Sequence, residues 1–151
     1  MPGPLDGVKV LEFTEIIAGP FGGLLLADMG ADVIKVEPPW GEPWRFIQQV
    51  VPNEGRQYMS LNRGKRCLTL NLKKPQAQEV VYRLMPDTDV VVLNARPDVP
   101  RSLGIDYETL SEINPRLVYC SNTAFGTDGP WSRMPGYDIV AQGVTGLMSA
   151  D

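Results

Sequence analysis

Histidine is absent from all 151 residues. Its absence excludes Ser-His-Asp and Cys-His catalysis, histidine metal sites and a histidine proton shuttle within this chain. Only two cysteines occur, Cys67 and Cys120, and neither belongs to a CxxC pair. The sequence therefore offers no zinc motif. We expect two reduced thiols, with one disulfide between them as the open alternative.

Long hydrophobic runs are also missing. The longest apolar stretch, residues 16–27, contains Gly19, Pro20, Gly22 and Gly23 and is too short to cross a bilayer. The N-terminus has no basic region of the kind that opens a secretory signal. We therefore expect a cytoplasmic protein with no membrane association.

Positive charge is in slight deficit, with 14 Lys and Arg against 18 Asp and Glu and a net charge of -4. This balance argues against a nucleic-acid partner. The hydrophobic fraction of 43% is typical of a globular domain, and a chain of this length can build a core without disulfides or metals. Fifteen glycines and fourteen prolines indicate many turns and shaped loops.

Strand and helix patterns alternate along the chain. Apolar or alternating runs predict strands at 8–14, 31–37, 66–72, 89–94 and 117–122. Helical spacing and end signals predict helices at 20–29 with Gly30 as C-cap, at 75–85, at 106–113 with Asp106 as N-cap, and from about 140 onward. The expected class is α/β with a largely parallel, doubly wound sheet, which binds ligands beyond the carboxyl ends of its strands.

Two segments leave their roles open. Residues 38–55 show no periodicity and predict a long loop, whose tryptophans, Trp40 and Trp44, either pack it onto the domain or cover a ligand. The basic turn containing Arg63, Lys65 and Arg66, followed by Lys73 and Lys74, is either solvated or a phosphate clamp.

A glycine-rich turn after the first strand and Glu37 at the end of the second strand suggest an NAD-binding oxidoreductase domain. The spacing disagrees, because Gly19, Gly22 and Gly23 do not form Gly-x-Gly-x-x-Gly. The alternative interpretation is that they are turn glycines at the head of a buried helix.

Ordered motifs along almost the whole chain resemble the class III CoA-transferases, the CaiB/BaiF family that includes formyl-CoA transferase, carnitine CoA-transferase and the α-methylacyl-CoA racemases. The opening motifs are PLDGVKVLEFT at 4–14, AGP at 18–20 and LADMGADVIKVEP at 26–38. Later motifs are NRGKR at 62–66, LNLK at 70–73, DVVVLN at 89–94, LGIDY at 103–107, NPRLVY at 114–119, GTDGP at 126–130 and PGYD at 135–138.

The resemblance implies transfer of coenzyme A between carboxylic acids through mixed-anhydride and enzyme-thioester intermediates on an aspartate. This chemistry needs no metal, no histidine and no tightly bound cofactor, since acyl-CoA is a substrate. The resemblance also implies that residues 1–151 are the N-terminal part of a Rossmann-like large domain. The nucleophilic aspartate, the small domain and the C-terminal part would follow Asp151, so we expect this chain alone to be inactive. Family members interlock as dimers, which implies a homodimer.

Carried over one residue at a time, the resemblance places Leu70 and Lys73 against the adenosine of coenzyme A, with Asn94 after its strand also in contact. Tyr137 would lie near the thioester. Ile17 stands where many members have glutamine, which affects acyl specificity.

Two further positions bear on the resemblance. Ser102 stands where many members have arginine, so Arg101 would have to supply that phosphate contact. Position 137 is histidine in the racemases, so Tyr137 favours a transferase over a racemase. For Asp138, the interpretation without a functional role is a helix N-cap. A non-catalytic nucleotide- or CoA-binding module remains the alternative function.

Overall fold

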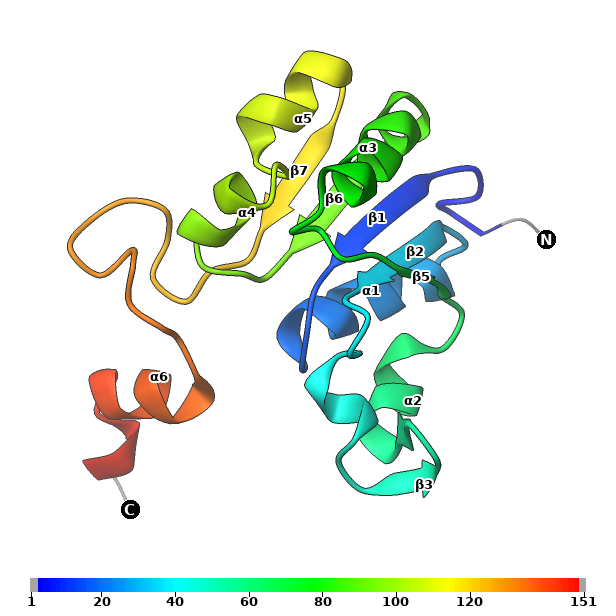
Figure 1. The fold of residues 1–151 in the computed structure, drawn as a ribbon. Coiled ribbons are helices and arrows are strands. Elements are labelled where there is room, and N and C mark those ends of the chain that lie inside the picture. The colour runs from blue at the N-terminus through cyan, green and yellow to red at the C-terminus, as the bar shows by residue number, and fades with distance from the viewer. Residues whose placement is uncertain (1–2, 150–151) are drawn as a thin grey trace.

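The computed structural model describes residues 3–149, which contain a five-stranded parallel sheet. The strand order is β5-β2-β1-β6-β7 (Figure 1). The strands are β1 (Lys9–Phe13), β2 (Asp32–Glu37), β5 (Arg66–Thr69), β6 (Val90–Leu93) and β7 (Val118–Ser121). Every strand predicted from the sequence is present, one to three residues shorter than expected. The expected α/β class with a parallel sheet is confirmed.

Helices occupy the connections between these strands. They are α1 (Ala18–Asp28), α2 (Arg56–Asn62), α3 (Pro75–Leu84), α4 (Asp98–Ser102), α5 (Tyr107–Ile113) and α6 (Asp138–Val144). Short 3-10 turns are η1 (Pro43–Arg45), η2 (Met85–Asp87) and η3 (Leu147–Ser149), and β3 (Gln49–Val51) pairs antiparallel with β4 (Glu54–Gly55). Among the described residues, no helix is long and apolar enough to cross a membrane.

The sheet is doubly wound because the chain reverses direction between its two halves. From β1 it moves outward through β2 to β5, and then returns to β6 on the other side of β1. Right-handed crossovers in opposite directions place α1 on one face and α3 with α5 on the other. The core follows this division: Val10 packs with Val33 on the α1 face, whereas Leu11 packs with Val81 and Leu110 on the opposite face.

The structure adds elements that the sequence patterns did not indicate. The segment expected to be a loop at 38–55 contains η1 and the β3–β4 hairpin, and α2 follows it directly. Helix α4 was also missed. Conversely, α1 begins at Ala18, two residues before the expected start at Pro20.

Three expectations about burial and capping are wrong: that α1 is buried all round, that Ile113 faces the core, and that Asp138 is a helix N-cap. Helix α1 is not buried all round, because Phe21 and Leu25 are nearly half exposed, and Ile113 of α5 is also exposed. Asp138 is the first residue of α6, and Tyr137 occupies the N-cap position. Asp106, by contrast, caps α5 as predicted, since its carboxylate accepts a hydrogen bond from the Thr109 backbone N–H at 3.1 Å.

Candidate functional site

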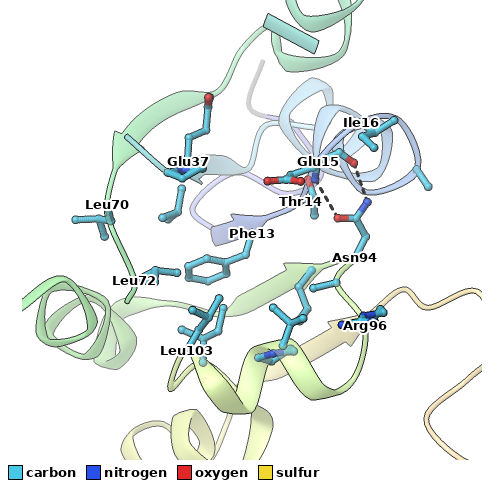
Figure 2. Close-up of a pocket in the computed structure, with 18 of the residues that line it drawn as sticks. Phe13, Thr14, Glu15, Ile16, Glu37, Leu70, Leu72, Asn94, Arg96 and Leu103 are labelled. Carbon is cyan, nitrogen blue, oxygen red and sulfur yellow. Dashed lines mark hydrogen bonds between the residues drawn. The ribbon is translucent and has the colours of Figure 1, made fainter. Parts of the chain in front are cut away.

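An open cavity of about 920 Å³ lies at the carboxyl ends of the strands, where β1 and β6 diverge into opposite crossovers. This is the topological switch point, the usual ligand site of a doubly wound sheet. Its lining comes from the β1–α1 turn, the end of β2, the segment after β5, the segment after β6 with α4, and residues 135–138. Figure 2 shows Leu70 and Leu72 on one side, Phe13 in the centre and Asn94 on the other side.

The cavity brings together most of the site residues expected from the sequence. Its lining includes Ile17, Leu70, Lys73, Asn94 and Tyr137. These residues come from four segments that are far apart in the sequence. Ile17 and Tyr137 expose their side chains by 49% and 63%, so both are accessible to a ligand. The sixth expected residue does not join them: Arg101 lies on α4 outside the cavity lining.

The side chain of Asn94 holds the main chain of the β1–α1 turn. Its Oδ1 accepts a hydrogen bond from the Glu15 N–H at 2.9 Å, and its Nδ2 donates to the Glu15 carbonyl at 2.8 Å (Figure 2). The next residue, Ile16, has a φ of +72°. A β-branched residue rarely adopts this conformation, so the surrounding contacts must impose it. Asn94 therefore shapes the turn that lines the cavity.

A buried chain of alternating charges lies beneath that turn, on the α1 face of the sheet. Lys35 contacts Glu12 and Glu42, each at 3.3 Å, and Lys65 contacts Glu12 at 2.8 Å; all four side chains are 0–1% exposed. Lys35 also donates to the Thr14 carbonyl at 2.8 Å. Burial lowers the pKa of Lys65, and pairing with Glu12 opposes this effect. The network ties β1, β2, the η1 segment and the α2–β5 turn together.

Glu37 ends β2, and its carboxylate accepts hydrogen bonds from three side chains and from the backbone N–H of Glu42 at 3.3 Å. Arg45 binds both of its carboxylate oxygens, at 2.6 and 2.8 Å, while Tyr58 and Cys67 donate to Oε1 at 2.6 and 3.0 Å. Burial raises the pKa of this carboxyl, but the hydrogen bonds outweigh burial and bring it to about 2. Burial also raises the pKa of the Cys67 thiol, so this cysteine is not an activated nucleophile.

These contacts remove the support for a dinucleotide site. The oxygens of Glu37 are already occupied, although a ribose would need them as acceptors. The glycines of the first turn serve close packing instead: a Cβ at Gly19 would lie 2.4 Å from the Cβ of Thr14, and one at Gly23 would lie 1.7 Å from Oε2 of Glu12.

The basic turn is similarly committed to internal pairs. Lys65 is buried against Glu12. Arg63 pairs with Asp28 and Arg66 pairs with Asp32, at 2.6 and 2.5 Å on the surface. The clamp interpretation is therefore wrong for Lys65, and Arg63 and Arg66 lie outside the cavity lining. Lys73 lines the cavity, and Lys74 does not.

Three further side chains line the cavity that the sequence did not single out, although two of them, Glu15 and Arg96, lie in segments expected to face a ligand after β1 and β6. Glu15 belongs to the β1–α1 turn, Arg96 follows Asn94 by two residues, and Phe13 is the last residue of β1. Their positions directly after strand ends were the available signal. Trp40, which was singled out, also lines the cavity and is 60% exposed, whereas Trp44 is half-buried outside it. Among the described residues, no acidic or cysteine cluster could hold a metal ion.

Comparison with known proteins agrees with this architecture. Residues 5–151 match the model of CoA-transferase family III. The chain is 43% identical over 97% of its length to a succinate–glutarate CoA-transferase of Agrobacterium fabrum, and 41% identical over 96% to the human succinyl-CoA:glutarate CoA-transferase. Among solved structures, a CaiB/BaiF family protein from Brucella suis superposes with a TM-score of 0.89 at 41% identity over 98% of the chain. The Rv3272 protein of Mycobacterium tuberculosis gives 0.90 at 40% identity over 99%.

The chain spans only part of each of these relatives. It covers 38% of the Agrobacterium protein, 34% of the human protein, 40% of the Brucella chain and 41% of the Mycobacterium chain. The match corresponds to the N-terminal two fifths of such proteins.

Proposed function

Because the chain belongs to CoA-transferase family III, we propose that it forms the coenzyme A-binding part of an enzyme that moves coenzyme A between two carboxylic acids. The observation that supports this most directly is the cavity at the switch point, whose lining includes five of the six residues that the family resemblance assigns to coenzyme A binding, all except Arg101. Leu70 and Lys73 would bind the adenosine end, and Ile17 with Tyr137 would lie toward the thioester.

The proposed reaction proceeds through an enzyme carboxylate. The carboxylate attacks the thioester carbonyl and forms a mixed anhydride, while coenzyme A leaves as its thiolate. The thiolate then attacks the enzyme's carbonyl, releasing the donor acid and leaving an enzyme thioester. The acceptor carboxylate repeats the two steps in reverse, so that the new acyl-CoA departs and the enzyme carboxylate is regenerated.

The proposal places the nucleophilic aspartate in sequence beyond residue 151, with residues 1–151 as the N-terminal part of the large domain. Two of the carboxylates that line the cavity are engaged: Glu37 by Arg45, and Asp138 by Gln142, whose Nε2 donates to it at 2.5 Å. The chain alone should therefore bind coenzyme A without turnover. Mass spectrometry after incubation with an acyl-CoA should show no covalent adduct, and an adduct on Glu15 or Asp138 would contradict this part of the proposal.

Binding by the chain is the first test. Isothermal titration calorimetry with coenzyme A should give a measurable affinity, which Lys73→Ala weakens by about fivefold through loss of one charge-assisted contact. Lys74→Ala is the matched control, because it removes the same charge one residue away from the cavity lining. Absence of coenzyme A binding, or equal effects of the two substitutions, would refute the assignment. NADH should not bind.

We also propose that the family's homodimer applies here. Exposed apolar side chains gather in the 131–148 segment, including Trp131, Ile139 and Leu147 at 49%, 63% and 59% exposure. Figure 1 shows α6 set apart from the sheet. Such surface in a globular protein is normally covered. Analytical ultracentrifugation should detect self-association, and a monomer at micromolar concentration would argue against it.

A further inference from the structure

One carboxylate in the cavity has no assigned role: that of Glu15. Figure 2 shows its side chain at the end of β1, between Asn94 on one side and Glu37 on the other. Its main chain is fixed at both the N–H and the carbonyl by Asn94. Because the following residue, Ile16, is held at positive φ, the turn has little freedom to swing the carboxylate away.

The charge of Glu15 is not neutralised by a direct contact. Within residues 3–149, no side chain donates a hydrogen bond to its carboxylate or pairs with it. The nearby cation Lys35 is committed to Glu12 and Glu42. Burial raises the pKa of Glu15, the charges of Glu42 and Glu37 raise it further, and Lys35 opposes them. This part of the cavity therefore presents a carboxylate that no cation among residues 3–149 pairs with.

The surroundings of Glu15 are otherwise apolar. Phe13, Ile16 and Ile17 line the same part of the cavity. The cations of the cavity lie elsewhere: Lys73 follows β5, and Arg96 lies beyond Asn94 and pairs with Asp98 at 3.3 Å. A ligand group that reaches the β1–α1 turn meets apolar side chains, the Glu15 carboxylate and the Asn94 amide near the start of α1.

We propose that Glu15 is a specificity-determining residue that disfavours acyl groups bearing a second carboxylate, so that the substrates of this site are uncharged monocarboxylic acyl-CoAs. The inference rests on the proposed function, which places the acyl group at Ile17. It predicts an acyl preference different from the dicarboxylic acids for which two relatives are named. A terminal carboxylate on a four-carbon acyl chain would approach the carboxylate of Glu15, and like charges near a protein surface repel more strongly than in bulk water.

Butyryl-CoA and succinyl-CoA form a matched pair for the test, because they have the same chain length and differ by a terminal carboxylate. Calorimetry with the chain at pH 7.5 and low salt should show butyryl-CoA binding about tenfold more tightly than succinyl-CoA. Glu15→Gln keeps the shape and removes the charge, and should reduce the ratio below twofold. Glu15→Lys should reverse the preference. Glu112→Gln, on an exposed position of α5 outside the cavity, is the control and should leave the ratio unchanged.

The outcomes distinguish a failure of this inference from a failure of the proposed function on which it rests. If the wild-type chain binds coenzyme A but prefers succinyl-CoA, Arg96 governs the acyl end and the inference is overturned. An unchanged ratio in both Glu15 variants, with circular dichroism showing folded protein, overturns it as well. Failure of the wild-type chain to bind coenzyme A itself would instead refute the proposed function. A ratio that shrinks on raising the salt concentration would support charge repulsion as the cause.

Discussion

Substituting alanine at Gly23 tests the packing of α1 against the buried charge network. Alanine favours a helix over glycine by about 1 kcal/mol, so a substitution in open space should stabilise the protein. At Gly23 the new Cβ would lie 1.7 Å from Oε2 of Glu12 and 3.2 Å from Nζ of Lys65. The carboxylate has to move, which disrupts a 2.8 Å ion pair between side chains that are 0–1% exposed.

Breaking a buried ion pair costs about 3–5 kcal/mol. After subtraction of the helix-propensity gain, Gly23→Ala should destabilise the protein by about 2–4 kcal/mol. Gly22→Ala provides the matched control in the same helix, because its Cβ would meet nothing within 4 Å. It should raise the free energy of unfolding by up to about 1 kcal/mol.

Urea unfolding followed by circular dichroism measures both variants against the wild type. The expected result is a gap of about 3–5 kcal/mol between the two alanine variants. If Gly23→Ala were as stable as Gly22→Ala, then Glu12 would not lie against α1 as the structure has it, and the description of the buried network would be wrong.

Three further predictions concern stability. Lys35→Met should lower the free energy of unfolding by about 3–5 kcal/mol, because it leaves Glu42 buried without its cation. Adding Glu42→Gln should recover part of that loss in urea titrations. If the effects of the two substitutions were simply additive, the pairing of Lys35 with Glu42 would be contradicted. Because the pKa of Glu37 is lowered to about 2, its stabilising contribution is complete above about pH 4.5 and is lost as the pH falls toward 2. Glu37→Gln should therefore flatten the pH dependence of the free energy of unfolding in that window. If the curves of the variant and the wild type were parallel, the lowered pKa of Glu37 would be refuted. Asp106→Ala should cost about 1 kcal/mol by removing the N-cap of α5, whereas Asp106→Asn should cost less.

The fold was predictable where burial of apolar runs decides the structure. The run at β6 is buried on both sides, as a central parallel strand requires. The helical spacing in α3 predicted an apolar stripe toward the core, which is correct for Val81 but wrong for Val80, which is exposed. The β3–β4 hairpin and α2 were not predictable in the same way. Strand β3 is wholly exposed, and its residues show no alternation of buried and exposed positions. Helix α2 buries only Tyr58, so it lacks an apolar stripe that a sequence pattern could reveal.

The alternating pattern of β2 does not reveal the surroundings of its polar residues. Alternation normally indicates one buried face and one face toward water. In this sheet helices cover both faces, so Lys35 and Glu37 are 0% and 4% exposed and find their partners within the protein. Ionic partners such as Glu42 and Arg45 come from a loop without periodicity, and a sequence pattern cannot pair a strand residue with a loop residue.

The shape of the cavity follows from this same buried network. Lys35 donates to the Thr14 carbonyl and Lys65 donates to the Pro20 carbonyl, each at 2.8 Å, so the two lysines hold both ends of the β1–α1 turn. Asn94 holds its middle, from a position 79 residues away in the sequence. Burying four charged side chains is costly and is weak evidence for stability by itself. Here the charges hold the main chain around Ile16 at a positive φ, which a β-branched residue disfavours. The β1–α1 turn held in this way forms one wall of the cavity.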